Sequence, residues 1–193
     1  ADLSGNLWFT EAFANKIGRI TTAGVVTEFP VPKPPPTLDG PGISALAGIA
    51  NGVDGDMWFT ENYANKIGRI TPSGVITEFP IPTVGSGPYN IEAGPDGNLW
   101  FTEEYGNNIG RITRSGVITE FPLPTAGSPL GIAAGPDGNL WFTEFDGNKI
   151  GRITTAGVVT EFSIPAANSR SEGITAGPDG NLWFTEAYAN KLG

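Results

Sequence analysis

Five glutamates have the clearest chemical potential in this sequence, because each closes a copy of one short segment, LWFTE or MWFTE: Glu11, Glu61, Glu103, Glu144 and Glu186. Carboxylate oxygens are the ligands that Mg²⁺ and Ca²⁺ prefer. Crowded carboxylates either rise in pKa or attract such a cation. The alternative is that each glutamate accepts hydrogen bonds from loop backbone amides. We favour this structural role, because a single site needs only one or two copies of a residue.

An aromatic residue follows each glutamate closely, by two positions at Phe13, Tyr63, Tyr105 and Tyr188 and by one position at Phe145. Such rings can line a platform for a carbohydrate or another flat small molecule. They can equally pack against the neighbouring repeat. Only three of the five carry a hydroxyl group, so we expect packing and retain the three tyrosines as ligand candidates.

Residues that break the repeat are stronger candidates for a ligand site, since a single ligand does not need a symmetric surface. GPYNIEAG stands where a sibling segment reads SPLGIAAG, and NSRSEGITAG is a second variant. If the chain has a pocket, we expect it at the residues that these variants introduce: Tyr89, Asn90, Glu92, Arg170 and Glu172.

The composition excludes several kinds of chemistry. The 193 residues contain no cysteine and no histidine, so the chain has no disulfide, no thiolate nucleophile, no Cys/His zinc site and no imidazole base. The formal net charge of -9 argues against nucleic acid and anionic membranes as partners. No apolar run approaches the roughly 20 residues of a membrane span. The acidic, lysine-poor composition leans towards an extracellular setting.

The elements that must position these residues are short strands in a repeated unit. Tryptophans mark its period of about 42 residues: Trp8, Trp58, Trp100, Trp141 and Trp183. One unit, 131–165, contains four runs rich in β-branched and aromatic residues (GIAA, LWFTE, KIGRIT and VVTEF), separated by turn signals. Four antiparallel strands per unit of this length are typical of a β-propeller blade. Solenoids, the competing fold, have shorter periods and one strand per turn.

We therefore predict an all-β fold, a β-propeller with about four and a half repeats forming one domain. The units run approximately over 1–42, 43–84, 85–125, 126–167 and, in part, 168–193. The longer link at 31–48 is interpreted as a surface insertion rather than a binding loop. Residues 1–18 are in phase with 176–193, so both ends offer the same second strand. Open sheet edges recruit strands. We expect a segment of a longer propeller, a protomer completed by another chain through self-association, or a small self-closed ring.

Other repeated residues are assigned to structure. The tryptophans and the phenylalanines that follow them are expected in the core between blades. Asn15, Asn65, Asn107, Asn148 and Asn190 fall in turns, where asparagine tolerates a left-handed backbone. Third-strand arginines are expected to pair across strands with fourth-strand glutamates. These pairs would join Arg19, Arg69, Arg111 and Arg152 to Glu28, Glu78, Glu120 and Glu161.

The combination GPDGNLWFTE, NKIGRIT and GVVTEF resembles the virginiamycin B lyase (streptogramin lyase) family over nearly the whole chain. The resemblance implies a seven-bladed propeller and, for the founding members, magnesium-dependent linearisation of cyclic streptogramin antibiotics. In those lyases a carboxylate and a histidine lie in a Glu-Pro-His-Gly-Ile segment. A second, metal-binding carboxylate closes the WFTE segment fourteen residues after the histidine.

The match to this machinery is partial. The WFTE glutamates correspond to the second carboxylate. The histidine positions hold Ala47, Tyr89, Leu130 and Glu172, and the first carboxylate positions hold Ala45, Gly87, Ser128 and Arg170. We therefore assign no catalytic residue and predict a non-catalytic propeller that binds a small molecule or carbohydrate and self-associates. No cofactor is assigned, and Mg²⁺ or Ca²⁺ at the WFTE glutamates is the candidate. The alternative is a portion of a magnesium-dependent streptogramin-type lyase.

Overall fold

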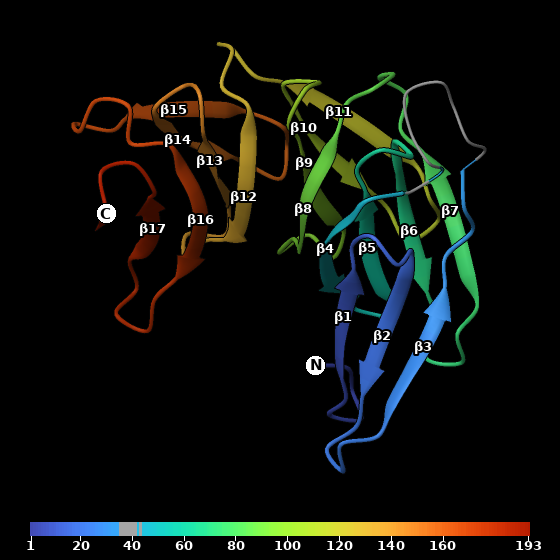
Figure 1. Ribbon diagram of the computed structural model, residues 1–193. Helices are drawn as coiled ribbons and strands as arrows, with labels where there is room; N and C mark the ends of the chain where they lie inside the picture. Colours follow the sequence, from blue (N-terminus) through green and yellow to red (C-terminus); the bar gives the residue numbers. More distant parts are fainter. Residues whose placement is uncertain (35–41, 43) are drawn as a thin grey trace.

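The computed structural model describes residues 1–34, 42 and 44–193, and within them every regular element is a β-strand (Figure 1). The strands form five antiparallel sheets, which follow one another in chain order along an open arc. The prediction of an all-β propeller built from antiparallel blades is confirmed. Within the link at 31–48, residues 35–41 and 43 fall outside the described residues, so its interpretation as a surface insertion stays a prediction. No helix in the described ranges is long and apolar enough to cross a membrane.

Each of the three middle sheets has four strands in sequence order. Sheet two contains β4 (Leu46–Asn51), β5 (Met57–Glu61), β6 (Lys66–Ile70) and β7 (Ile76–Pro80). Sheet three contains β8 (Pro88–Ala93), β9 (Leu99–Glu103), β10 (Asn108–Ile112) and β11 (Ile118–Pro122). Sheet four contains β12 (Pro129–Ala134), β13 (Leu140–Glu144), β14 (Lys149–Ile153) and β15 (Val159–Ser163).

The two end sheets have three strands each. Sheet one contains β1 (Leu7–Glu11), β2 (Lys16–Ile20) and β3 (Val26–Pro30), which correspond to the second to fourth strands of a middle sheet. Sheet five contains β16 (Ser171–Ala176), β17 (Leu182–Glu186) and β18 (Lys191–Leu192), which correspond to the first three.

Turn chemistry sets the hairpins. The asparagine between the second and third strands has a positive φ in every unit, for example 57° at Asn65 and 53° at Asn107, which confirms the left-handed turns. The next turn places Gly116 at φ 88° against the ring of Phe79 from the preceding blade. A side chain at Gly116 would collide with that ring, so the glycine allows the two sheets to approach closely.

The first strand of each blade lies innermost, where β4, β8, β12 and β16 pack side by side. Threonines from the second strands tie these inner strands together. The Thr60 hydroxyl accepts a hydrogen bond from the Gly48 amide in its own blade and donates one to the Tyr89 carbonyl in the next. The corresponding hydroxyls of Thr102 and Thr143 do the same. The inner strands bulge at this point, because the hydroxyl replaces a ladder partner.

The hydrophobic core lies between successive blades. Between sheets two and three, Trp58 and Ile67 pack against Leu99, Phe101 and Ile112 of the next blade. The same set recurs at the two neighbouring interfaces. In sheets two and three both the tryptophan and the following phenylalanine are fully buried, as predicted.

The predicted arginine–glutamate pairs are wrong. Arg111 lies opposite Thr119 rather than Glu120, so the two charged side chains leave opposite faces of the sheet. The Arg111 guanidinium instead sits over the rings of Trp100 and Phe121, 5.5 and 5.6 Å from their centroids. The fourth-strand glutamates pair with lysines: Lys16–Glu28, Lys66–Glu78 and Lys149–Glu161.

Candidate functional site

One edge of the sheets brings together the loop that precedes each inner strand and the loop that follows each second strand. We call these paired loops the rim. Backbone hydrogen bonds join them, from the Tyr63 amide to the Ser44 carbonyl and from the Tyr105 amide to the Ser86 carbonyl. The Tyr188 amide bonds to the Ser169 carbonyl in the same way. The rim therefore carries the loop aromatics and the start of each inner strand, and the WFTE glutamates end the strands that lead into it, as the strand order predicted.

The glutamates lie beneath the rim rather than on it. Glu61, Glu103 and Glu144 are completely buried, and Glu186 is nearly so, whereas Glu11 in the three-stranded first sheet is half-buried. Burial raises the pKa of Glu61, Glu103 and Glu144 to about 7. The negative charge of a fourth-strand glutamate in the same blade adds to this effect on each pKa.

The surroundings of these carboxylates are close-packed and poor in donors. Glu103 Oε2 accepts a hydrogen bond of 3.0 Å from the Asn108 side chain, while both carboxylate oxygens of Glu61 and Glu144 lack a donor. At Glu144, side chains added to Gly127 or Gly147 would collide with the carboxylate. Among the described residues no backbone amide donates to the three buried carboxylates, so the expected amide contacts are not formed there.

The glutamates do not converge on a common centre. Within 1–34, 42 and 44–193, no group of three or more Asp, Glu, His or Cys side chains is placed to hold a metal ion. Each blade instead keeps its own carboxylate pair, such as Glu103 and Glu120. Binding of Mg²⁺ or Ca²⁺ at these positions remains a prediction.

The loop aromatics behave differently from the glutamates. Phe13, Tyr63, Tyr105 and Tyr188 are 78%, 70%, 68% and 74% exposed. The packing role expected for the loop aromatics is therefore wrong at Phe13, Tyr63 and Tyr105, whereas Tyr188 contacts a ring of the preceding blade. Phe145 is half-buried and meets the edge of Tyr188, with ring centroids 6.5 Å apart. The rim therefore presents aromatic rings to solvent in several successive blades.

Arg170 completes an aromatic cluster at the last rim loop. Its guanidinium lies 4.8 Å from the Phe145 ring centroid and 5.8 Å from that of Tyr188, and it forms an ion pair with Asp146. Its backbone φ is 52°, and the corresponding residues of the other blades, Ala45, Gly87 and Ser128, also have positive φ values. A non-glycine residue in this region is strained.

The other symmetry-breaking residues lie apart from this cluster. Tyr89 and Asn90 border a shallow hollow of about 270 Å³ with Ala47 and Gly48 on the neighbouring inner strand. Glu92 follows on the same strand, and partial burial raises its pKa. Glu172 is exposed on β16. The predicted residues thus form two separate places on the inner strands rather than one pocket.

A repeated asparagine clamp was not foreseen from the sequence. The Asn65 side-chain oxygen accepts hydrogen bonds from the amide and hydroxyl of Ser86, and its amide group donates to the Ile81 and Thr83 carbonyls. It therefore fixes the link between blades to the start of the next inner strand. The signal was the serine that precedes three inner strands by two residues, at Ser44, Ser86 and Ser169. Asn148 accepts from the amide and hydroxyl of Ser169 in the same way, and Asn15 accepts from the Ser44 amide.

Comparison with known proteins gives one consistent result. The sequence model of the virginiamycin B lyase family matches residues 1–193. A selenomethionine-substituted virginiamycin B lyase from Staphylococcus aureus is 53% identical, with a TM-score of 0.93; the alignment covers 100% of this chain and 63% of that one. No curated protein matches the sequence.

Two further solved structures agree. A catalytically inactive histidine-to-alanine form of the S. aureus lyase with quinupristin is 54% identical, with a TM-score of 0.91, and the alignment covers 100% of this chain and 63% of that one. A streptogramin B lyase is 45% identical, with a TM-score of 0.89 and coverage of 99% and 65%. The chain thus spans just under two thirds of the length of these structures.

Proposed function

The chain belongs to the virginiamycin B lyase family, and we propose that its rim binds a cyclic streptogramin which these 193 residues do not cleave by themselves. The observation that carries the proposal is the row of exposed aromatic rings on the rim. Four of the five loop aromatics are more than two thirds exposed, although large aromatic side chains are usually buried.

The rim is suited to stacking. Backbone hydrogen bonds to the preceding loops hold the main chain at Tyr63 and Tyr105 in place, so little backbone ordering is needed when a ligand binds. The Tyr105 pKa is raised by the neighbouring Glu104 charge, by burial and by Tyr63, so Tyr63 and Tyr105 lie near each other on the rim. Aromatic rings with a polar end favour a ligand that has both apolar and hydrogen-bonding groups.

The absence of cleavage rests on the missing histidine. The sequence contains no histidine, and a histidine-to-alanine form of the S. aureus relative is catalytically inactive. The positions that match the family's histidine are held by Ala47, Tyr89, Leu130 and Glu172. The carbonyls of these residues bind the preceding blade's threonines, and none of their side chains is a general base of the imidazole type.

The magnesium ion of the family's lyases does not fit the donor set that the described residues provide. Mg²⁺ needs near-octahedral oxygen coordination and usually keeps several waters. The Glu103 carboxylate is fully buried with one neighbouring carboxylate, Glu120, and has no room for a hydrated ion. We derive no step through a metal.

The test is calorimetric titration of quinupristin into the 193-residue chain, with mass spectrometry of the ligand afterwards. We expect saturable binding and an intact ring. The double variant Tyr63→Ala/Tyr105→Ala should weaken binding about 5- to 150-fold, because each lost ring contact contributes roughly 0.5–1.5 kcal/mol. The matched control is Val75→Ala/Val117→Ala, two exposed residues in turns between third and fourth strands.

Two results would contradict the proposal. If quinupristin gave no binding heat at any accessible concentration, or if the control variant weakened binding equally, the rim would not be the binding surface. A linearised product would instead support the alternative, a portion of a magnesium-dependent lyase. The observation that favours this alternative is Glu103, because a buried carboxyl with a pKa of about 7 is a common form of catalytic acid or base.

A further inference from the structure

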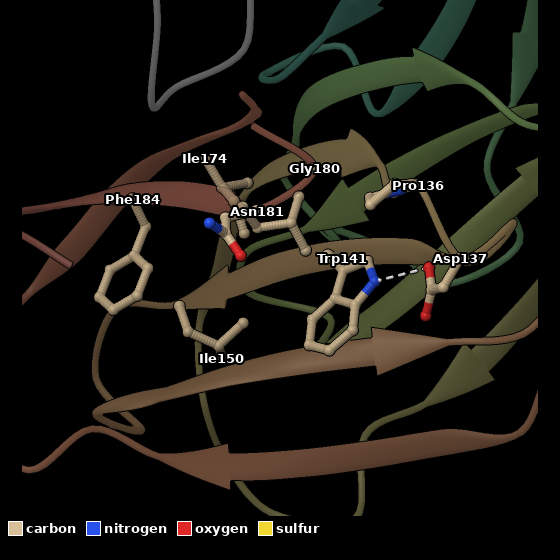
Figure 2. Close-up of a pocket in the computed structure, with 9 residues that line it drawn as sticks. Pro136, Asp137, Trp141, Ile150, Ile174, Gly180, Asn181 and Phe184 are labelled. Atoms are coloured by element: carbon tan, nitrogen blue, oxygen red, sulfur yellow. Dashed lines mark hydrogen bonds between the residues drawn. The ribbon is translucent and has the colours of Figure 1, made fainter. Parts of the chain in front are cut away.

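An apolar hollow of about 360 Å³ lies between sheets four and five, bordered by Trp141, Ile150 and Phe184 (Figure 2). Among the described residues that line it, Asp137 is the one charged group. Its carboxylate already accepts hydrogen bonds from the Trp141 indole and the Asn139 side chain, at 3.0 and 2.8 Å. The hollow therefore offers no uncompensated charge that could hold a polar ligand.

The rim loop of sheet three, in contrast, carries a negative charge with no cationic partner among the described residues. This is Glu104, which breaks the repeat because the other units hold Ala12, Asn62, Phe145 and Ala187 at the same position. Glu104 is half-buried and forms no salt bridge with any described residue. Burial raises its pKa, since the charge is partly desolvated and no cation compensates for it. An acid found in one blade alone is not needed to build the repeat.

Tyr105 places an aromatic ring beside this carboxylate. A side chain at Gly87 would come within 2.5 Å of the Tyr105 ring, so the ring lies against the backbone there. The Tyr105 side chain is nonetheless 68% exposed, which leaves its other face open to solvent. Of the effects that raise the Tyr105 pKa, the charge of Glu104 is the largest. The carboxylate and the open ring therefore lie side by side.

A second tyrosine reaches the same part of the rim from the preceding blade. The Asn62 side chain donates a hydrogen bond of 3.2 Å to the Pro88 carbonyl. Pro88 is next to Gly87, on which the Tyr105 ring lies. Tyr63 follows Asn62 directly and is 70% exposed. Blades two and three thus bring two exposed rings and one uncompensated carboxylate together.

This combination is suited to a positively charged organic group. The face of an aromatic ring attracts a cation that lies within about 6 Å of its centroid, and groups of aromatic side chains recognise quaternary ammonium ligands in this way. A neighbouring carboxylate adds a charge–charge attraction. The net charge of -9 favours the approach of cations over a longer range. A metal ion such as Mg²⁺ or Ca²⁺ would need more oxygen ligands than this one carboxylate supplies.

We propose, building on the proposed function, that Tyr63, Glu104 and Tyr105 bind an ammonium group, so that the rim selects a ligand that carries a positively charged amine. The two rings contact the alkyl groups on the nitrogen. The ligand's charge compensates the carboxylate, which has no cation in the free chain. Of two streptogramins of the same size, the one with a protonated amine binds more tightly than the neutral one.

The first test compares choline with its neutral isostere 3,3-dimethylbutan-1-ol, in which a carbon atom replaces the charged nitrogen. Proton NMR follows the ring resonances of the chain's four tyrosines during each titration. We expect choline to shift the Tyr63 and Tyr105 resonances in a saturable way. The isostere should bind about 5- to 30-fold more weakly, which corresponds to two exposed cation–π contacts of about 0.5–1 kcal/mol each.

The second test removes the charge and keeps the shape of the side chain. Glu104→Gln should weaken choline binding about 2- to 5-fold, the range of a single solvent-accessible ion pair. The matched control is Glu172→Gln, which removes the same charge from an exposed position on β16 and should leave choline binding unchanged. Tyr63→Leu/Tyr105→Leu should abolish the discrimination between choline and the isostere.

Three results would overturn the ammonium site: equal binding of choline and the isostere, equal binding of choline by Glu104→Gln and the unsubstituted chain, or shifts confined to Tyr89 and Tyr188. Titration of quinupristin separates this site from the proposed function. If quinupristin binds and choline does not, the ammonium site is wrong while the rim still binds a streptogramin. If choline binds as expected and quinupristin does not, the ammonium site stands and the streptogramin assignment is wrong.

Discussion

The WFTE glutamates and the loop aromatics lie one or two residues apart in the sequence, yet Glu103 and Tyr105 differ completely in exposure. Glu103 is fully buried with a raised pKa, whereas Tyr105 is 68% exposed. Glu103 is the last residue of β9 and lies on the same side of the strand as Phe101, facing the interior between blades. Tyr105 lies beyond the strand end, outside that alternation. Recurrence alone therefore does not distinguish a residue that builds the blade from one that is available to a ligand.

The largest expected effect comes from truncating one buried interior residue and one exposed rim residue of the same blade. Trp100 is fully buried, stacks on Phe121 with ring centroids 5.4 Å apart and donates to Asp96. Trp100→Ala should lower the free energy of unfolding by about 3–5 kcal/mol. Tyr105→Ala should change it by less than about 0.5 kcal/mol. Chemical denaturation of both variants measures the difference, and similar losses would abolish the distinction between interior and rim.

The next largest effect concerns the buried carboxyl itself. The folded-state pKa of Glu103, about 7, lies above its ordinary value of 4.5, so the native state holds the proton more tightly than the unfolded chain. Stability should therefore fall as the pH rises from about 4.5 to about 7. Glu103→Gln removes the part of this pH-dependent loss of stability that Glu103 causes, which is on the order of 1–3 kcal/mol.

The measurement is the melting temperature of both proteins at pH 5 and pH 8. The melting temperature of Glu103→Gln, relative to that of the unsubstituted chain, should be higher at pH 8 than at pH 5. Tyr105→Phe, on the exposed side of the comparison, should show no such pH dependence. An unchanged pH profile for Glu103→Gln would mean that the carboxyl is not held in its protonated form.

Much of the blade could be predicted from the sequence, because strand periodicity and turn chemistry are local. The four strands, the buried Trp58 and Phe59 and the left-handed turn at Asn65 were all accessible in this way. The partner of Arg111 was not, since a one-residue difference in hairpin register moves a side chain to the other face.

The exposure of the candidate site residues could not be predicted from the sequence of one unit. Whether Glu144 is exposed depends on the Gly127 and Gly147 loops that close over it. Whether Phe145 is covered depends on Arg170 and Tyr188 from the next unit. These contacts join residues of different loops and blades, so no periodic pattern within one unit reveals them.

Variants at Asn65 measure how much the asparagine clamp contributes to stability. Asn65→Gly keeps the φ of 57° accessible but loses the side-chain bonds to Ser86 and to the Ile81 and Thr83 carbonyls. The free energy of unfolding should fall by about 1–2 kcal/mol. Asn65→Ala should lose roughly a further 1 kcal/mol, because it adds strain in the left-handed region. Equal stability of the two variants would show that the backbone conformation carries no strain there.

The smallest expected effect lies at Arg170, where rim contacts and backbone strain oppose each other. Arg170→Ala removes the contacts with the Phe145 ring and the ion pair with Asp146, and it keeps a non-glycine residue at φ 52°. An exposed cation–π contact is worth about 0.5–1 kcal/mol, so the alanine variant should be destabilised by about that amount. Arg170→Gly loses the same contacts but relieves a strain of roughly 1 kcal/mol, and should unfold within about 0.5 kcal/mol of the unsubstituted chain. Glycine already occupies the equivalent position at Gly87. If both variants lost more than about 2 kcal/mol in chemical denaturation, Arg170 would belong with Glu103 and Trp100 to the interior, and its cluster would no longer count as a surface free to contact a ligand.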